Sequence, residues 1–264
     1  MKAAIDIALR AKISLMVVGL TVVSFATSAP ELLVSLNAAI NGHMDISFGN
    51  VIGSNIANIA LILGLTAMVF PINVSNRTMK FDWSVMMIIT LLLLAFLWDG
   101  KLVFWEAAVL VLILITYNVY QIRSSRKKER ELEEDTSLAL LKWWQMLGYL
   151  VIGVASLKFG SEFLVKGAVN LATIWGISER VIALSIVSIG TSLPELAASL
   201  VASFKGKQDL SLGNLIGSNI FNILAVLGFT GMLVELPLDS KALLTYDFPW
   251  LILISLVLFP FMRY

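Results

Sequence analysis

Two stretches, SFATSAPELLVSL at residues 24–36 and SIGTSLPELAASL at residues 188–200, decide the fold of this chain. They lie 164 positions apart, and the same offset relates DISFGNVIGSNIANI at 45–59 to DLSLGNLIGSNIFNI at 209–223. Around these motifs, residues 20–66 align with residues 184–230 without a gap, and about 26 of the 48 positions counted from Gly19 are identical. Self-similarity of this extent indicates an internal duplication.

The composition places the duplicated segments in a membrane. Of the 264 residues, 58% are hydrophobic and 14% are charged, which is more apolar than an ordinary soluble domain. Apolar runs of roughly 18 to 26 residues recur along the chain, long enough to cross a hydrocarbon layer about 30 Å thick. We predict an all-α polytopic membrane protein with about eight transmembrane helices, at residues 13–40, 47–70, 82–98, 102–122, 145–170, 179–204, 211–234 and 245–262.

The positions of lysine and arginine predict the orientation, because these residues concentrate in cytoplasmic loops. With a cytoplasmic N-terminus, 14 of the 19 basic residues fall on the cytoplasmic side, and Lys101, Arg180 and Lys241 fall outside. The first motif then opens on the first span and the second motif on the sixth, so the two copies have opposite orientations. We therefore predict an inverted-topology repeat, an architecture that places substrate sites near the midplane between the copies.

A charged stretch separates the two copies. Residues 123–137 carry a basic run followed by acidic residues, and we interpret them as a solvated cytoplasmic connector, although a basic cluster beside a membrane can also contact anionic lipid. The predicted organisation is a first repeat at residues 1–122, a linker at 123–141 and a second repeat at 142–264.

Each copy carries one glutamate, Glu31 or Glu195, inside an apolar span. An ionised group at this depth costs several kcal/mol unless it has a partner, and neither segment contains a nearby lysine or arginine. Such a carboxylate either keeps a proton or binds a cation. One glutamate alone fits a structural hydrogen bond, but two at matching positions favour a cation site.

The residues before each glutamate support this interpretation. Hydroxyl groups precede it by four and three positions, and therefore share its helical face: Thr27 and Ser28 before Glu31, and Thr191 and Ser192 before Glu195. The intervening proline has no amide hydrogen and turns the residue before it away from helical geometry. We predict a broken or kinked helix lined by polar atoms at each motif.

The second motif supplies a polar stripe, because hydrogen-bonding side chains recur at four-residue spacing on one helical face. The stripe comprises Asn50, Ser54 and Asn58 and, in the second copy, Asn214, Ser218 and Asn222. The glycines of each G-x-x-x-G step allow another helix backbone to come close. We expect the serine and the last asparagine of each stripe to bind ions. Asn55 and Asn219 fit ion binding and hydrogen bonding between helices equally well.

The types of candidate ligand restrict which ion the site can bind. Carboxylate, hydroxyl, amide and carbonyl oxygens without histidine or cysteine suit Ca²⁺ or an alkali cation and argue against zinc or copper. Two carboxylates neutralise one Ca²⁺ or two Na⁺, so the same pocket can hold either in turn. An antiporter requires such a competition.

The motifs TSAPE at 27–31, TSLPE at 191–195 and the two GSNI-x-N blocks resemble those of the cation/calcium antiporter superfamily, and within it the sodium/calcium exchanger branch. The resemblance implies a transporter of Ca²⁺ and Na⁺ rather than an enzyme, without a cofactor, in a prokaryotic plasma (inner) membrane. It implies that Glu31 and Glu195 bind Ca²⁺ centrally, aided by Thr27 and Thr191. The residues that it implies for the neighbouring Na⁺ positions are Ser28, Ser54, Asn58, Ser192, Ser218 and Asn222, with backbone carbonyls from Ser24 and Ser188.

The resulting hypothesis is exchange of Ca²⁺ for Na⁺ by alternating access, and two alternatives stay open. One is Ca²⁺/H⁺ exchange, which an empty two-carboxylate pocket permits. The other is a truncated membrane protein that binds cations without transporting them. The second alternative arises because the family norm is ten spans, and the alignment of the halves leaves the expected first and tenth helices without a counterpart.

Overall fold

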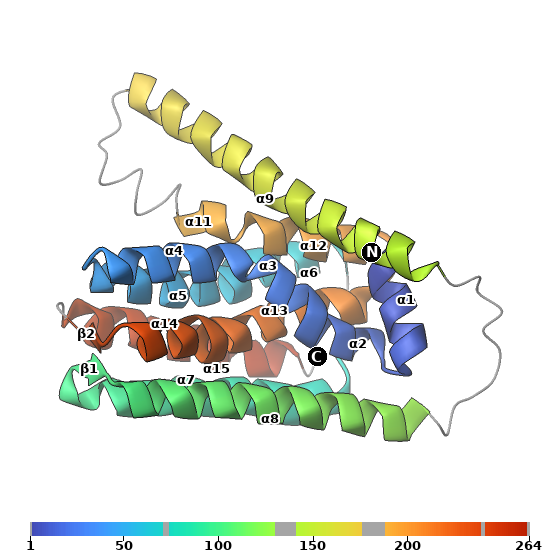
Figure 1. Cartoon of the computed structure of the whole chain (residues 1–264), viewed down its shortest axis with the longest axis horizontal. Coiled ribbons are helices and arrows are strands. Elements are labelled where there is room, and N and C mark those ends of the chain that lie inside the picture. Colours follow the sequence, from blue (N-terminus) through green and yellow to red (C-terminus); the bar gives the residue numbers. More distant parts are fainter. Residues whose placement is uncertain (1, 71–73, 130–140, 176–187, 239–240, 263–264) are drawn as a thin grey trace.

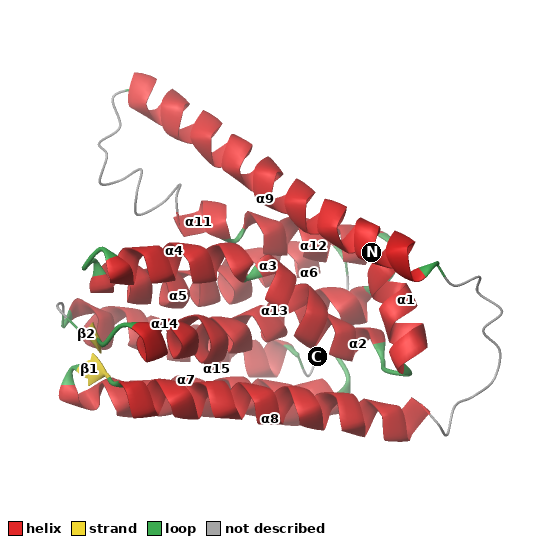
Figure 2. Cartoon of the chain, viewed as in Figure 1, coloured by secondary structure: helices red, strands yellow, loops and turns green. Residues whose placement is uncertain are grey.

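The computed structural model describes residues 2–70, 74–129, 141–175, 188–238 and 241–262. Within these ranges the chain is almost entirely helical, with one pair of two-residue strands (Figure 2). The helices are α1 (Lys2–Ala11), α2 (Leu15–Val18), α3 (Ser24–Thr27), α4 (Ala29–Ile40), α5 (Met44–Ile56), α6 (Gly64–Val69), α7 (Trp83–Phe96), α8 (Phe104–Glu129), α9 (Trp143–Ile174), α11 (Ser188–Thr191), α12 (Leu193–Phe204), α13 (Gln208–Phe221), α14 (Gly228–Leu233) and α15 (Phe248–Phe261).

Several of these helices join through π-helical segments into longer rods. Ala57–Leu63 connects α5 to α6, and Asn222–Leu227 connects α13 to α14 at the matching place of the second copy. Gly19–Val23 connects α2 to α3 in the same way, while Thr78–Asp82 and Leu243–Asp247 precede α7 and α15. π-helical turns add a residue to the turn and are frequent at functional sites.

The predicted fold class is confirmed. Within the described residues, five helices are long and apolar enough to cross a membrane, namely Met44–Val69, Thr78–Asp99, Phe104–Arg126, Gln208–Leu233 and Leu243–Phe261. They match the predicted spans 47–70, 82–98, 102–122, 211–234 and 245–262. The predicted span 145–170 lies within α9. The chain is therefore an all-α polytopic membrane protein.

The two predicted spans that carry the glutamates, 13–40 and 179–204, are broken beside their prolines, as predicted, and residues 179–187 of the second lie outside the described residues. At Ser28, between α3 and α4, the backbone leaves helical geometry with φ −82° and ψ 2°. Ser192 has almost the same conformation between α11 and α12, with φ −86° and ψ 3°. Ahead of the first predicted span, residues Lys2–Ala11 form the helix α1. This helix meets residues 15–27 at a bend of 118°.

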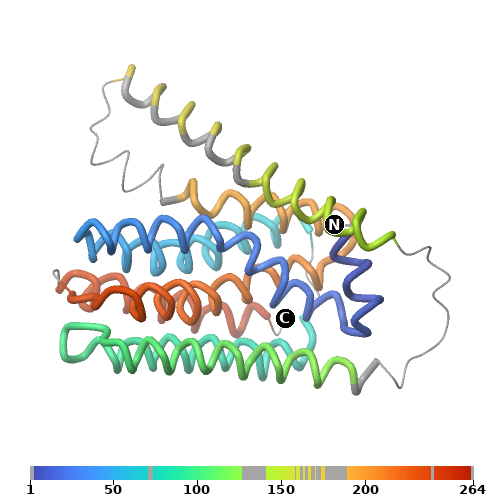
Figure 3. The backbone as a smooth tube through the Cα atoms, in the orientation of Figure 1, coloured from blue at the N-terminus to red at the C-terminus, as the bar shows by residue number. Residues whose placement is uncertain are grey.

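The two glutamate-bearing helices run in opposite directions, as an inverted repeat requires. In Figure 1, α4 continues from α3 toward the left end of the view, whereas α12 continues from α11 toward the right. The tube in Figure 3 shows the same antiparallel course, with α7 and α8 along one side of the bundle and α9 crossing the opposite side. The rod of α13 and α14 lies between them.

The glycines of the second copy confirm the predicted close approach. A Cβ atom added at Gly213 would lie 2.5 Å from the Met16 carbonyl oxygen, and one added at Gly19 would lie 2.7 Å from the Leu210 carbonyl oxygen. The backbones of α13 and of the segment from α2 to α3 are therefore in direct contact. Around Gly49 and Gly53, no atom of the described residues lies within 4 Å of an added Cβ.

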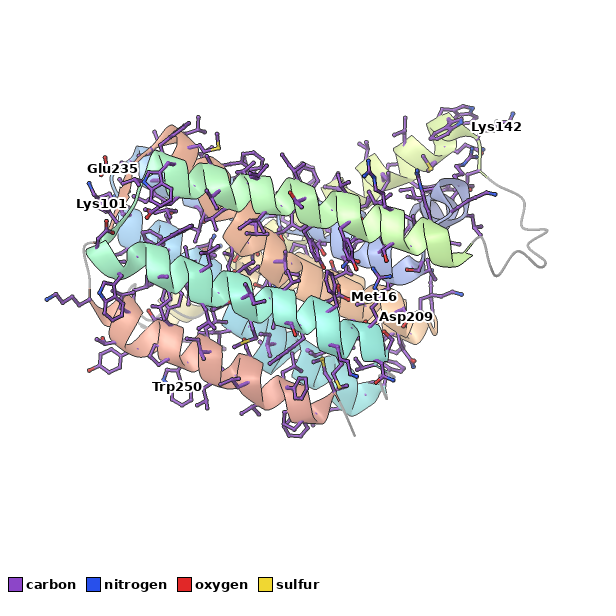
Figure 4. The ribbon with its side chains drawn as sticks, turned by 90° about the horizontal axis from the view of Figure 1, so that it is seen from below. Met16, Lys101, Lys142, Asp209, Glu235 and Trp250 are labelled. Atoms are coloured by element: carbon purple, nitrogen blue, oxygen red, sulfur yellow. The ribbon has the colours of Figure 1, made fainter. Side chains whose placement is uncertain are left out.

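A short antiparallel pairing ties the two copies together at one end of the bundle. Strand β1 (Lys101–Leu102) pairs with β2 (Leu236–Pro237), and the Leu238 amide donates to the Gly100 carbonyl at 2.8 Å. On its outer side, Lys101 Nζ lies 2.9 Å from Glu235 Oε1 (Figure 4). The β1–β2 tie thus joins the loop between α7 and α8 to the end of α14.

At the other end, α1 and the start of α2 hold the end of α8 and the start of α9. The Arg10 guanidinium donates to the Leu141 carbonyl and lies over the Trp143 ring, 4.7 Å from its centroid. The Ser14 amide donates to Ser125 Oγ on α8 at 2.8 Å. Most of the predicted linker, residues 130–140, lies outside the described residues, and the division into two repeats and a linker stays a prediction.

Candidate cation-binding site

The two glutamates come together in the interior. Glu31 lies in the first turn of α4 and Glu195 in the first turn of α12, and both side chains are 0% exposed. A hydrogen bond from Ser28, three residues before Glu31, to the Glu195 carboxylate joins the two glutamate segments. Each stands at a helix N-terminus, where unpaired amides and the helix dipole favour negative charge. The fold therefore concentrates two negative groups between the copies.

The hydroxyl groups of the first motif reach across to the second copy. Ser28 Oγ donates to Glu195 Oε1 at 3.4 Å. Thr27 Oγ1 donates to Asn214 Oδ1 at 3.1 Å and lies 3.2 Å from Ser218 Oγ. Each copy's TSxPE segment thus packs against the polar stripe of the other copy.

The second copy repeats this arrangement toward the first. Thr191 Oγ1 donates to Asn50 Oδ1 at 3.4 Å and lies 3.5 Å from Ser54 Oγ. Residues that are 164 positions apart therefore make equivalent contacts on both sides of the site. The threonine contacts of the pocket wall are therefore symmetric, whereas the Ser28–Glu195 bond has no counterpart between Ser192 and Glu31 among the described residues.

Asn50 and Asn214 fix the backbone beside the glutamates. Asn50 Nδ2 donates to the Glu31 carbonyl at 3.2 Å and to Ser35 Oγ at 2.9 Å. Asn214 Nδ2 does the same to the Glu195 carbonyl at 3.4 Å and to Ser199 Oγ at 3.1 Å. Since each asparagine also accepts a hydrogen bond from the threonine of the other copy, it links both motifs.

Four further asparagines form the centre of the contact between the rod of α5 and α6 and the rod of α13 and α14. Asn55 Nδ2 donates to the Asn219 carbonyl at 3.2 Å, and Asn219 Nδ2 donates to the Asn55 carbonyl at 3.4 Å. Asn58 Nδ2 then donates to Asn219 Oδ1, and Asn222 Nδ2 to Asn55 Oδ1, both at 3.0 Å. Asn55 and Asn219 therefore make the hydrogen bonds between helices that we weighed against ion binding.

Several buried oxygens of this pocket have no hydrogen-bond partner among the described residues: Glu31 Oε1 and Oε2, Glu195 Oε2, Asn58 Oδ1, Asn222 Oδ1 and Ser192 Oγ. A buried carboxylate oxygen without a partner is costly. The amide nitrogens of Asn58 and Asn222 already donate hydrogen bonds, so the Oδ1 atoms of these two residues are the groups that remain free to bind a cation. An arrangement of unpartnered oxygens around two carboxylates can bind a hard cation.

The structure brings the predicted site residues together. Fully or nearly fully buried are Ser24, Thr27, Ser28, Glu31, Ser54, Asn58, Ser192, Glu195, Ser218 and Asn222, while Thr191 is half-buried. Ser188 begins α11, and only its backbone is described. The Ser24 carbonyl already accepts from the Ser28 amide at 2.9 Å. Thr27 Oγ1 also lies within hydrogen-bond distance of this carbonyl, at 3.3 Å. The role of the Ser24 carbonyl as an ion ligand therefore stays a prediction.

Sequence reasoning did not single out the residues that hold the pocket wall in place. Ser35 and Ser199 were not named as functional, and Asn50 and Asn214 were placed on the polar stripe without a specific role. A signal was present, because all four are polar residues repeated at the 164-residue offset within apolar spans. Polar residues inside membrane helices usually hydrogen-bond another helix.

A cavity of about 340 Å³ leads from the surface toward this site. It lies between α1, α9 and α12, and its walls include Ala26, Thr27 and Asn214 together with Gly153 and Leu157 of α9. Apolar side chains dominate its lining, and polar atoms occur where it meets the site. The cavity therefore reaches the site along α9.

Comparison with known proteins agrees with this geometry. The family model described as "Sodium/calcium exchanger protein" matches residues 1–123 and 145–264. The putative antiporter CaxA of Alkalimonas amylolytica is 43% identical over 247 residues, which cover 90% of this chain and 76% of that protein. The sodium/calcium exchanger MaX1 of Methanosarcina acetivorans is 30% identical over 310 aligned positions, covering 98% of this chain and 85% of that protein.

The fold is also that of a solved exchanger. The structure of the sodium-calcium exchanger NCX_Mj, soaked with 2.5 mM Na⁺ and 0.1 mM Ca²⁺, superposes with a TM-score of 0.83 at 32% sequence identity. The match covers 99% of this chain and 83% of that chain. Motifs, fold and family model agree, and the chain belongs to the sodium/calcium exchanger protein family, a family of membrane transporters and not of enzymes.

Proposed function

We propose that this chain exchanges Ca²⁺ for Na⁺ across the membrane by alternating access, with the ions bound between the two inverted repeats. The observation that carries the proposal is the pair of buried carboxylates, three of whose four oxygens have no hydrogen-bond partner among the described residues. An ionised carboxylate at membrane depth costs several kcal/mol without a partner. A bound cation removes this cost, so the loaded states are favoured over the unloaded one.

The two carboxylates also explain the exchange. One Ca²⁺ or two Na⁺ neutralise them, and the two loads exclude each other because they need the same oxygens. A transporter that changes conformation only when the charge is neutralised then couples the two ion flows. Na⁺ entering down its gradient drives Ca²⁺ in the opposite direction.

Each predicted ligand has a role in this proposal. Glu31 and Glu195 hold Ca²⁺ with help from Thr27 and Thr191. The neighbouring Na⁺ positions use Ser28, Ser54, Asn58, Ser192, Ser218 and Asn222, together with the Ser24 and Ser188 carbonyls. The Asn58 and Asn222 oxygens are suited to this role because their amide nitrogens are bound to Asn219 and Asn55, which leaves each Oδ1 free of a described partner.

Ca²⁺/H⁺ exchange is the second candidate, and the same oxygens favour it. Two carboxylates can take up two protons in place of two Na⁺, because protonation also neutralises them. The two mechanisms differ in the gradient that moves Ca²⁺. They share the carboxylates, so substitution of Glu31 or Glu195 does not distinguish them.

The test is Ca²⁺ efflux from liposomes that contain the full chain and are loaded with radioactive Ca²⁺. At equal pH on both sides, an inward Na⁺ gradient is expected to accelerate efflux, whereas a choline gradient is not. A pH gradient without Na⁺ is the parallel measurement for the second candidate. Ca²⁺ flux that ignores Na⁺ and follows the pH gradient would overturn Na⁺ coupling.

Single substitutions connect the flux to the site. Glu31→Gln and Glu195→Gln are each expected to abolish Na⁺-driven efflux, since one remaining carboxylate cannot neutralise a divalent ion at membrane depth. Glu235→Gln is the matched control, because it makes the same chemical change at an exposed position. Ca²⁺ binding by the wild-type chain without any flux would instead favour a non-transporting cation-binding protein.

We further propose that the N-terminus lies in the cytoplasm and that the membrane is the plasma (inner) membrane. The proposal is supported by the asymmetry of the basic residues, of which 14 of 19 fall on the side of the N-terminus. A reporter fused to the N-terminus measures this directly, and activity of an exported reporter there contradicts it.

A further inference from the structure

Asn55 and Asn219 occupy corresponding positions of the two rods, at the junction between an α-helix and a π-helical segment. Asn55 lies in the last turn of α5, before Ala57–Leu63, and Asn219 in the last turn of α13, before Asn222–Leu227. A π-helical turn changes the pattern of backbone hydrogen bonds, so the carbonyls beside such a junction can accept from other donors. Both side chains are 1% exposed, and buried polar atoms of this kind need partners within the protein.

The hydrogen bonds of these asparagines have a fixed direction, because each series starts at a backbone carbonyl. A carbonyl oxygen only accepts, so the bond from Asn219 Nδ2 to the Asn55 carbonyl, at 3.4 Å, fixes the orientation of the Asn219 amide. Asn219 Oδ1 then lies on the other side of the amide, where it accepts from Asn58 Nδ2 at 3.0 Å. This bond orients the Asn58 amide in turn, and Asn58 Oδ1 is the atom without a partner among the described residues.

The second series is the counterpart of the first at the 164-residue offset. The Asn219 carbonyl accepts from Asn55 Nδ2 at 3.2 Å, and Asn55 Oδ1 accepts from Asn222 Nδ2 at 3.0 Å. Asn222 Oδ1 again has no partner in the described part of the chain. Each series crosses from one rod to the other and back. The orientation of each candidate ligand, Asn58 or Asn222, therefore depends on an asparagine of the opposite copy.

The orientation of Asn58 and Asn222 decides whether they can bind a cation. The amide torsion of asparagine has a broad and roughly two-fold distribution, so an unrestrained amide can turn either its oxygen or its NH₂ group toward the pocket. The oxygen is a ligand for hard cations, whereas the NH₂ group only donates hydrogen bonds and repels a cation. Both side chains are 0% exposed, and at a buried site this electrostatic difference is strengthened by the low local dielectric.

We propose that Asn55 and Asn219 are positioning residues that determine the affinity of the site for Na⁺, because each holds the ligand oxygen of an asparagine in the other copy toward the bound ion. The inference rests on the proposed function, in which these ligand oxygens belong to the Na⁺ positions and Ca²⁺ is bound mainly by the two glutamates. Loss of either positioning residue therefore weakens Na⁺ binding more than Ca²⁺ binding. The outcome is a changed competition between the two ions.

Competition binding tests the proposal without requiring transport. Binding of radioactive Ca²⁺ to the full chain, purified in detergent, is measured at increasing Na⁺ concentrations, which gives the Kd for Ca²⁺ and the inhibition constant for Na⁺. Asn219→Leu has no amide to hold Asn58, and it is expected to raise the Na⁺ inhibition constant about tenfold, the effect of one lost partner at a buried site. The Kd for Ca²⁺ is expected to stay close to the wild-type value. Asn55→Leu is expected to act in the same way through Asn222.

The two possible failures are distinguishable. Wild-type Ca²⁺ binding that Na⁺ does not displace would overturn the proposed function, and this inference with it. Equal displacement by Na⁺ in the wild type and in both leucine variants would overturn the inference alone. If leucine prevents the chain from folding, Asn219→Ala and Asn55→Ala give the same comparison without adding a bulky side chain.

A double-mutant cycle separates positioning from a general loss of packing. If Asn219 acts through Asn58, Asn219→Leu causes no further loss of Na⁺ affinity in a chain that already carries Asn58→Leu. In a chain with Asn222→Leu, which belongs to the other series, Asn219→Leu is expected to keep its full effect. Additive losses of Na⁺ affinity in both double variants would overturn the proposal.

Trp83→Phe is the structural control, because it removes a hydrogen bond between two helices away from the four asparagines. Trp83 Nε1 donates to the Ser255 carbonyl at 2.8 Å and so links α7 to α15. This variant is expected to lower Tm and to leave the ratio of the two binding constants unchanged. An equal loss of Na⁺ and Ca²⁺ affinity in Asn219→Leu would show that Asn219 has a purely structural role, and would contradict the proposal.

Discussion

The two rods that carry the GSNI-x-N motif have closely similar sequences and very different surroundings. In the most apolar window of the rod Gln208–Leu233, 89% of the residues are buried, against 50% in the rod Met44–Val69. Yet their polar residues make matching hydrogen bonds, from Asn50 and Asn214 outward. The hydrogen bonds on the site-facing side of each rod are therefore determined by the sequence that the two rods share. The burial of the other sides depends on which helices pack against each rod.

The glycine positions give the largest expected difference between the rods. Gly213→Ala would place a methyl group against the Met16 carbonyl, and overpacking against backbone costs typically 1 to 3 kcal/mol of stability. Gly49→Ala meets no described atom within 4 Å, and alanine favours a helix over glycine by about 1 kcal/mol. Thermal unfolding in detergent is expected to show a lower Tm for Gly213→Ala only. An equal decrease for Gly49→Ala would show that both rods are enclosed alike.

Substitution of the paired asparagines tests whether the site itself is symmetric. Asn214→Ala and Asn50→Ala each leave a glutamate carbonyl and a serine hydroxyl without their donor. Loss of a buried partner costs roughly 1 to 3 kcal/mol, so Ca²⁺ affinity measured by calorimetry is expected to fall about ten- to a hundredfold in both. Asn41→Ala is the control, as its exposed side-chain amide donates to Asn37 on the same helix and lies away from the site. A much larger loss of Ca²⁺ affinity in one of the two variants would mean that the unequal burial of the two rods also affects the site.

The smallest expected effect concerns the exposed ion pair between Lys101 and Glu235, beside the β1–β2 pairing at the end of α14. The hydrogen bond and charge of Glu235 raise the pKa of Lys101 above its ordinary value of 10.5. The shift of the Lys101 pKa therefore contributes its full stabilisation of the folded state below pH 10.5. This stabilisation disappears as the pH rises through the raised pKa of Lys101. Both side chains are exposed, so Glu235→Gln is expected to lower Tm only slightly near neutral pH. A Tm difference that persists in strong alkali would contradict this assignment.

Much of the site was predictable, because its determinants are local. Four-residue spacing places Asn50, Ser54 and Asn58 on one face, and a proline within an apolar span predicts the break beside each glutamate. The duplication then predicts that both copies face one pocket. These inferences needed only helix geometry and the cost of burying charge.

The remaining features depend on tertiary contacts that periodicity does not encode. The π-helical segment at Ala57–Leu63 changes the helical repeat at Asn58 without a glycine or proline to mark it. The exchange of hydrogen bonds between Asn55 and Asn219 depends on how closely the rods pack. The helix α1 was also missed, since ten residues are too few for a span and its stability comes from packing on α2 and α9.

The contacts of α1 have a consequence for the continuity of the chain. Arg10 holds the segment that begins at Leu141, and Ser14 holds the end of α8 through Ser125. The two ends of the connector are thus anchored to a third element, independently of the peptide bonds between them. The Arg10 contacts with Leu141 and Trp143 cross the connector, so we expect two separate polypeptides, divided between residues 129 and 141, to associate when they are produced together.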